Sequence, residues 1–111
     1  MSKSQRSLVA QLRLGILPLA IETGRYTNTP INERLCFWCK NKVENEFHFV
    51  YECILYENLR IELFSYMFQK IPGFLILSEE EKFLCIMKSD DRLLHIFVEK
   101  AWNIRKTKIY M

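Results

Sequence analysis

The sequence predicts a mainly α fold, a small helical domain with an inserted cysteine-rich segment. Apolar residues recur at helical spacing in several segments, and strand-like alternation is scarce. Only three glycines and three prolines are present, fewer than the many turns of a β-sandwich or barrel call for. One stretch, "CFWCKNKVENEFHFVYEC" at residues 36–53, holds three of the four cysteines and one of the two histidines.

The length of 111 residues suits a single domain. Half of the residues are hydrophobic and 14% are aromatic, a composition that favours a packed core over a disordered chain. We therefore expect one domain over residues 1–111, with an N-terminal helix and loop at 4–35, the cysteine-rich segment at 36–53 and a helical part at 53–111. A chain this short buries a smaller fraction of its surface than a large domain does, so a bound metal ion would help to stabilise it.

The first helix is expected at residues 4–17. One face of it carries apolar residues at every fourth position, namely Leu8, Leu12 and Ile16. Gly15 weakens the end of this helix, and Pro18 terminates it. Loop-forming residues then fill the chain up to Cys36.

Three further helices follow the cysteine-rich segment. The first is expected at residues 53–70, and the second begins at Ser78, because Ser78 and Glu81 have the spacing of a capping box. The third is expected at residues 92–108, with "SDD" at 89–91 as an N-cap. The apolar stripe of the 53–70 helix is Leu55, Leu59, Leu63 and Met67, and that of the 92–108 helix is Leu93, Phe97, Ala101 and Ile104.

The cysteines and histidine of the segment have metal-ligand spacing. The pattern is Cys36-x2-Cys39-x8-His48-x4-Cys53. Two thiolates separated by two residues fit on one tight turn, and zinc takes four such sulfur and imidazole ligands in a tetrahedron. This set predicts a zinc-knuckle (Cys-Cys-His-Cys) insertion that holds one structural Zn²⁺, with no open position for a catalytic water.

The second ligand pair imposes a geometric constraint. On a regular α-helix, residues five apart lie about 140° apart around the axis. His48 and Cys53 therefore cannot converge on one ion from a regular helix. Either His48 lies in the preceding loop and Cys53 at the helix N-terminus, or a π-turn lies between them. The first arrangement is the one we expect.

A different interpretation makes these residues ordinary members of an apolar core. Cysteine is among the most often buried residue types, and aromatic residues surround this segment. The redox context favours the metal. The chain has no apolar run of about 18 residues and no cleavable signal sequence, so we expect an intracellular protein without membrane partners. Cysteines in such a protein are reduced or metal-bound.

Basic residues are concentrated at the two ends of the chain. Residues 1–32 carry four basic residues and one acid, and residues 100–111 carry four basic residues and no acid. Such ends can contact phosphate, and exposed aromatic residues can stack on bases. The candidate nucleic-acid contacts are Arg6, Arg13, Arg25, Phe37, Trp38, Lys100, Arg105, Lys106 and Lys108. The plainer alternatives are a solvated basic surface and aromatic packing around the metal.

No pattern of a catalytic site is found in the sequence. It has no phosphate-binding glycine-rich loop, no nucleophile elbow and no plausible pair of acid–base carboxylates. Cys85 lies among apolar neighbours and is expected to be a buried thiol, and His95 is expected to be a core or boundary histidine. Asp90 and Asp91 are better explained as helix-capping residues than as a metal-binding pair.

Several stretches together resemble a known family. "RSLVAQLRLGILPLAIETGRY", "ERLCFWC" and "VENEFHFVYECILYENLR" are similar to the region that follows the polymerase domain in non-LTR retrotransposon (LINE-type) reverse transcriptases. The shared pattern runs through Leu12, Arg13, Gly15, Pro18, Leu19, Gly24, Arg25, Arg34, Cys36, Cys39, Val43, Glu44, Glu46, His48, Phe49, Cys53, Leu55 and Tyr56. Relatives often have Pro after the last cysteine, where this chain has Ile54.

This resemblance implies a non-catalytic part of a retroelement protein, or of a gene derived from one. The tail of that family is thought to engage nucleic acid, most simply the RNA of the element, while the polymerase and endonuclease sites lie upstream. We therefore expect no enzymatic activity and an RNA partner. Two alternatives remain: a structural or protein-interaction domain that packs on a polymerase domain or another partner, and a truncated fragment without independent function.

Overall fold

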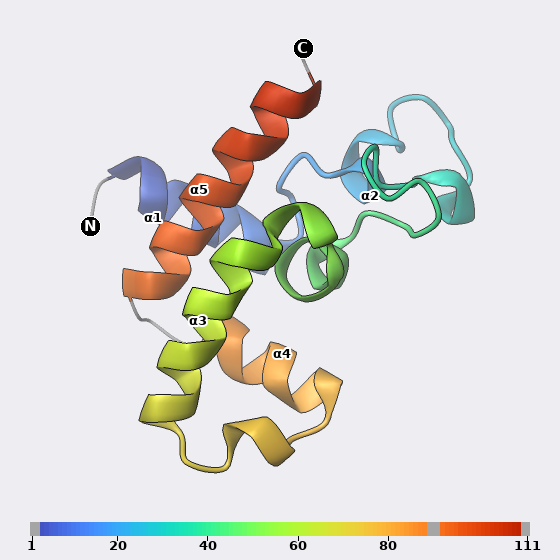
Figure 1. Cartoon of the computed structure of the whole chain (residues 1–111). Coiled ribbons are helices and arrows are strands. Elements are labelled where there is room, and N and C mark those ends of the chain that lie inside the picture. The colour runs from blue at the N-terminus through green and yellow to red at the C-terminus, as the bar shows by residue number, and fades with distance from the viewer. Residues whose placement is uncertain (1–2, 89–91, 110–111) are drawn as a thin grey trace.

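The computed structural model describes residues 3–88 and 92–109. Five α-helices are formed within these ranges (Figure 1): α1 (Lys3–Leu14), α2 (Ala20–Thr23), α3 (Glu57–Lys70), α4 (Glu79–Lys88) and α5 (Arg92–Ile109). Shorter helical turns are η1 (Ile31–Glu33), η2 (His48–Glu52), η3 (Ile54–Tyr56) and η4 (Phe74–Ile76). The described part is 71% helical and contains no strand, which confirms the predicted small, mainly α fold.

Helix α5 is the centre of the bundle. It packs against α1 on one side and α3 on the other, while α4 turns back and lies beside the C-terminal turns of α3 (Figure 1). The core between these helices is apolar and includes Val9, Leu12, Leu63, Met67, Leu94, Phe97, Val98 and Ala101. Residues 20–47 form a separate lobe beside the bundle. Within the described residues, no helix has both the length and the apolar character needed to cross a membrane.

Helix α1 ends earlier than the sequence pattern indicates. Gly15 adopts a φ of +73°, its N–H bonds to the carbonyl of Leu12, and the Ile16 N–H bonds to the carbonyl of Gln11. This is a Schellman motif, which closes a helix through a left-handed residue. The helix therefore stops at Leu14 rather than at residue 17, and Ile16 is 51% exposed instead of facing the core.

The remaining helices follow their predicted stripes closely. Leu63 and Met67 are fully buried, and Leu55 and Leu59 pack against the core from α3 and the turn before it. The regular helix begins at Glu57, later than expected, because residues 54–56 form a 3₁₀ turn first. Helix α5 covers residues 92–109, in agreement with the predicted 92–108.

The predicted cap of α4 is present in part. The backbone N–H of Glu81 donates to Ser78 Oγ at 3.2 Å, as a capping box requires. The Ser78 hydroxyl in turn donates to the Glu81 carboxylate at 3.2 Å. The expected N-cap at Asp90 and Asp91 lies outside the described residues.

A buried ion pair joins the lobe to the bundle. Glu44, 1% exposed, receives two hydrogen bonds from the Arg105 guanidinium on α5, at 2.7 and 2.8 Å. The same carboxylate accepts the backbone N–H of Ala20 at 2.7 Å, at the start of α2. One side chain therefore connects the cysteine-rich segment, α2 and α5.

Candidate metal centre

Four side chains from two turns of the cysteine-rich segment converge on one point. The ligand atoms of Cys36, Cys39, His48 and Cys53 all lie within 4.8 Å of one another. The Cys53 sulfur is 3.9 Å from that of Cys36 and 3.8 Å from that of Cys39. Three of the four residues are buried, and Cys39 is half-buried. The cluster predicted from the spacing is thus formed, and it could hold a metal ion.

A tight turn places the first two cysteines side by side. The Cys36 N–H bonds to the carbonyl of Lys42, and the Lys40 N–H bonds to the carbonyl of Cys36. Lys40 adopts a φ of +65°, a left-handed conformation that reverses the chain direction. The Cys39 N–H lies 3.5 Å from the Cys36 sulfur. A backbone donor aimed at this sulfur favours its thiolate form.

The second ligand pair uses the π-turn, not the loop that we expected. Residues 48–52 form a π-helical turn, closed by the Cys53 N–H donating to the carbonyl of His48 at 2.8 Å. A bond between residues five apart widens the turn, so residue i+5 returns to the same side as residue i. The Asn45 side chain accepts the His48 N–H at 2.8 Å and fixes the start of the turn. Cys53 does precede the helical region, as predicted, because the 3₁₀ turn begins at the next residue.

The histidine is oriented by a carboxylate that the sequence reasoning missed. His48 Nδ1 lies 3.4 Å from Glu52 Oε1, and the other oxygen of Glu52 lies 3.2 Å from the Lys42 ammonium. A carboxylate only accepts, so Nδ1 carries the proton and Nε2 holds the lone pair. Nε2 is buried without a hydrogen-bond partner among the described residues. The position of Glu52, four residues after a candidate ligand, is the signal that could have identified it.

The close approach of the sulfurs perturbs their ionisation. The side-chain contact with the Cys53 sulfur lowers the pKa of Cys36, although burial opposes its charge. The same contact, together with burial, raises the pKa of Cys53. Burial disfavours the charged form of His48, but the Cys36 sulfur and the Glu52 carboxylate outweigh it and raise the pKa of His48. A cation bound between the sulfurs would stabilise both as thiolates.

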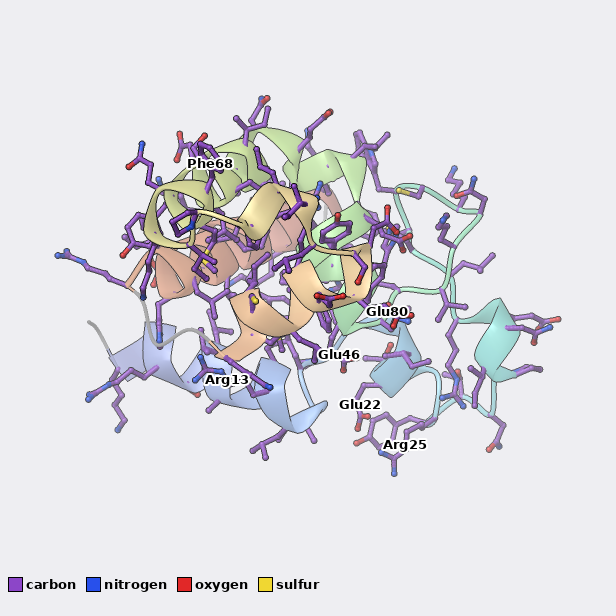
Figure 2. The ribbon with its side chains drawn as sticks, turned by 90° about the horizontal axis from the view of Figure 1, so that it is seen from below. Arg13, Glu22, Arg25, Glu46, Phe68 and Glu80 are labelled. Atoms are coloured by element: carbon purple, nitrogen blue, oxygen red, sulfur yellow. The ribbon has the colours of Figure 1, made fainter. Side chains whose placement is uncertain are left out.

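The candidate phosphate contacts differ in their exposure to solvent. The side chains of Arg6, Arg13, Arg25, Lys100, Lys106 and Lys108 are exposed, whereas that of Arg105 is largely buried. Arg13 reaches the end of α4 and donates to the carbonyl of Met87, and Arg25 lies beside Glu22 (Figure 2). Arg105 differs from our expectation, because its guanidinium is committed to Glu44. We therefore remove Arg105 from the candidate nucleic-acid contacts and assign it a structural role.

The two candidate stacking residues also differ from each other. Trp38 is 45% exposed, and the Lys108 ammonium lies over its ring, 5.7 Å from the centroid. Phe37 is half-buried, with the Arg105 guanidinium 5.7 Å from its ring centroid. Trp38 is thus available to a ligand, while Phe37 packs beside the buried ion pair. The remaining cysteine and histidine are outside the cluster: Cys85 is half-buried on α4 and His95 is buried on α5.

Comparison with protein-family models, with curated proteins and with solved structures finds no match. The resemblance to retrotransposon reverse transcriptases therefore stays a prediction. The helical fold and the Cys-Cys-His-Cys cluster rest on the chain's own residues and geometry.

Proposed function

We propose that the cluster binds one structural Zn²⁺, and that the chain is a non-catalytic, zinc-stabilised module that binds single-stranded nucleic acid, most simply RNA. Zinc accounts for the spacing of the sulfurs. A tetrahedron with Zn–S bonds of about 2.3 Å has edges of about 3.8 Å. The measured S···S separations of 3.8 and 3.9 Å match this edge.

The chemistry of the donors also suits zinc. Three thiolates and one imidazole are a common structural zinc set, and they leave no position for a reactive water. A ligand histidine usually donates its second ring N–H to a carboxylate, which is the role that Glu52 fills beside His48. The metal would therefore hold the fold together and take no part in a reaction.

The contact of Lys108 with Trp38 is the single observation that carries the nucleic-acid proposal. It joins the basic end of α5 to the exposed aromatic residue of the knuckle, although 70 positions separate them in the chain. Lys40 and Lys42, both exposed, follow Trp38 closely in the same turn. Ammonium groups around an exposed ring are the combination that binds single strands, because cations contact phosphates and the ring stacks on bases.

Salt dependence tests this proposal directly. Zinc-loaded protein should bind a short single-stranded RNA, and the logarithm of the affinity should fall linearly with the logarithm of salt concentration. Replacing both Lys106 and Lys108 by Gln should lower affinity and reduce the slope by about 0.7 for each phosphate that the variant no longer neutralises. Lys88→Gln is the control, since Lys88 is an exposed residue at the end of α4 and is not among the candidate contacts. Absence of binding, or a response that is flat with salt, contradicts the proposal.

A separate observation favours a second candidate function, a protein-interaction domain. A groove of about 400 Å³ runs along α3, with Ile61, Phe64, Phe68 and Leu75 in its walls. Ile61 is 59% exposed and Leu75 is 55% exposed, and Figure 2 shows Phe68 on the outer face of α3, away from α1. Exposed apolar grooves of this kind mark protein contacts.

The resemblance suggests a polymerase domain as the occupant of this groove. A reverse transcriptase domain of the resembled family, added as a separate chain, should then bind the protein. Phe68→Lys should abolish that binding, while Ile76→Lys, at an exposed residue outside the groove, should leave it unchanged. Equal binding by both variants would remove this second candidate.

A further inference from the structure

A cleft of about 550 Å³ opens beside the metal cluster. Its walls come from four parts of the chain: the turn at residues 38–42, which we call the knuckle turn, the π-turn, Ile54 at the start of η3, and Glu79 at the start of α4. Two cluster residues, Cys39 and His48, form part of its lining. The volume falls in the range of small-ligand sites, so the cleft can accept a group the size of one nucleobase.

Two aromatic side chains form walls of this cleft. Tyr51 stacks on Phe47 with ring centroids 5.1 Å apart and contacts Phe64 at 5.5 Å, so its ring is held firmly in place. Trp38 lines the cleft and remains 45% exposed, so part of its ring area is open to a ligand. A flat aromatic ligand can stack on such a ring, and stacking tolerates any base.

The polar groups that line the cleft include both hydrogen-bond donors and hydrogen-bond acceptors. Asn41 and Lys42 supply N–H donors, and the carboxylates of Glu52 and Glu79 supply acceptors. Carboxylates repel a phosphate, so the cleft itself is unsuited to the backbone of a strand. The edge of a nucleobase carries donors and acceptors side by side and suits this mixed lining. The ammonium groups of Lys40 and Lys108 lie outside the cleft lining, where phosphates would pass.

We propose that this cleft binds one unpaired nucleobase of a single strand, with guanine preferred. Trp38 stacks on the base, the Glu79 carboxylate accepts its edge N–H groups, and Lys42 or Asn41 donates to its oxygen. Among the four bases, guanine alone presents two adjacent N–H groups and a carbonyl oxygen on one edge. This inference rests on the proposed nucleic-acid function and names the position where that function reads a base.

The test uses zinc-loaded protein and four RNA heptamers, (U)₃-X-(U)₃, which differ only in the central base. Fluorescence anisotropy should give the tightest binding for X = G. Glu79→Gln should reduce the preference for G over A at least severalfold, because the amide replaces one of the two acceptor oxygens by an NH2 group that only donates. Glu80→Gln is the matched control: Glu80 is adjacent on α4, is labelled in Figure 2, and does not line the cleft.

A second pair of variants tests the stacking wall. Trp38→Ala should weaken all four heptamers by about tenfold, and Trp38→Phe should restore most of the loss. Tyr26→Ala is the control, because Tyr26 is 80% exposed and lies outside the cleft lining. Zinc content and far-UV circular dichroism establish that each variant keeps the fold.

The outcomes separate this inference from the function on which it rests. If the wild-type protein binds no heptamer, the proposed function fails and the inference fails with it. If binding is salt-dependent but equal for all four bases, and the Glu79 and Trp38 variants behave like their controls, the base cleft is wrong while the nucleic-acid function stands. A preference for G that falls in Glu79→Gln but not in Glu80→Gln, together with weaker binding of all four heptamers by Trp38→Ala but not by Tyr26→Ala, supports both.

Discussion

At the scale of single residues, Glu52 has the clearest role outside the four candidate ligands. Its carboxylate accepts from His48 Nδ1 and pairs with Lys42, so it connects a ligand to the knuckle turn. This contact fixes the tautomer in which Nε2, buried without a hydrogen-bond partner, carries the lone pair that could bind a metal ion. It also raises the basicity of the imidazole, which strengthens its bond to a metal.

Glu52→Gln should therefore weaken zinc binding by about 10–100-fold while leaving the protein folded in excess zinc. Titration against a chromogenic zinc chelator measures the affinity. Glu33→Gln is the control, since Glu33 is exposed and lies outside the cluster. Identical zinc affinities for the two variants would show that Glu52 does not support the ligand histidine.

At the scale of elements, two local turns determine where the chain leaves its helices. One is the left-handed Gly15 that ends α1, and the other is the π-turn at residues 48–52. A side chain at Gly15 would meet nothing closer than Glu46, at 3.6 Å, so space is available. The glycine is required by its backbone conformation alone, because left-handed φ is unfavourable for residues with a Cβ atom.

Gly15→Ala should accordingly lower the free energy of unfolding by about 1–2 kcal/mol. Gly73→Ala is the matched control, because its φ is −92° and a Cβ atom there has no neighbour within 4 Å. Chemical denaturation of the zinc-loaded proteins measures both. A Gly15→Ala protein as stable as Gly73→Ala would contradict the Schellman assignment.

These two turns also show what the sequence can predict at this scale. The stripes of α3 and α5 are readable because buried helix faces repeat every three to four residues, as Leu59, Leu63 and Met67 do. The position of Gly15 indicated a helix end, but not that the helix stops before residue 17. The π-turn has no local signature. The requirement that His48 and Cys53 meet at one ion left two arrangements, a loop before Cys53 or a π-turn. The sequence favoured the loop, and the structure has the π-turn.

At the scale of the whole molecule, the pair of Glu44 and Arg105 holds the lobe on the bundle. The two residues are 61 positions apart, and both side chains are largely buried, at 2% and 11% exposure. A sequence reports the charge of Arg105 but not its burial, because burial depends on how distant segments pack. For this reason the sequence placed Arg105 among phosphate contacts, whereas Lys108 in the same helix remains exposed.

Removing one partner should leave the other charge buried and unpaired. Glu44→Ala is therefore expected to cost about 3–5 kcal/mol of unfolding free energy. Arg25→Ala, which breaks the more exposed pair with Glu22, should cost less than about 1 kcal/mol. Thermal and chemical unfolding of the two variants in zinc-containing buffer gives the comparison. Similar small losses in both would mean that the buried pair does not fasten the lobe.

The zinc content of the purified protein, measured by elemental analysis, tests the central claim most directly. We expect one zinc per chain, with loss of helicity on chelation, because binding free energy of a structural zinc is folding free energy. The double variant Cys36→Ser, Cys39→Ser should lose both zinc and helical signal, whereas Cys85→Ser, outside the cluster, should keep both. A double variant that retains a full equivalent of zinc and its helicity would contradict the account.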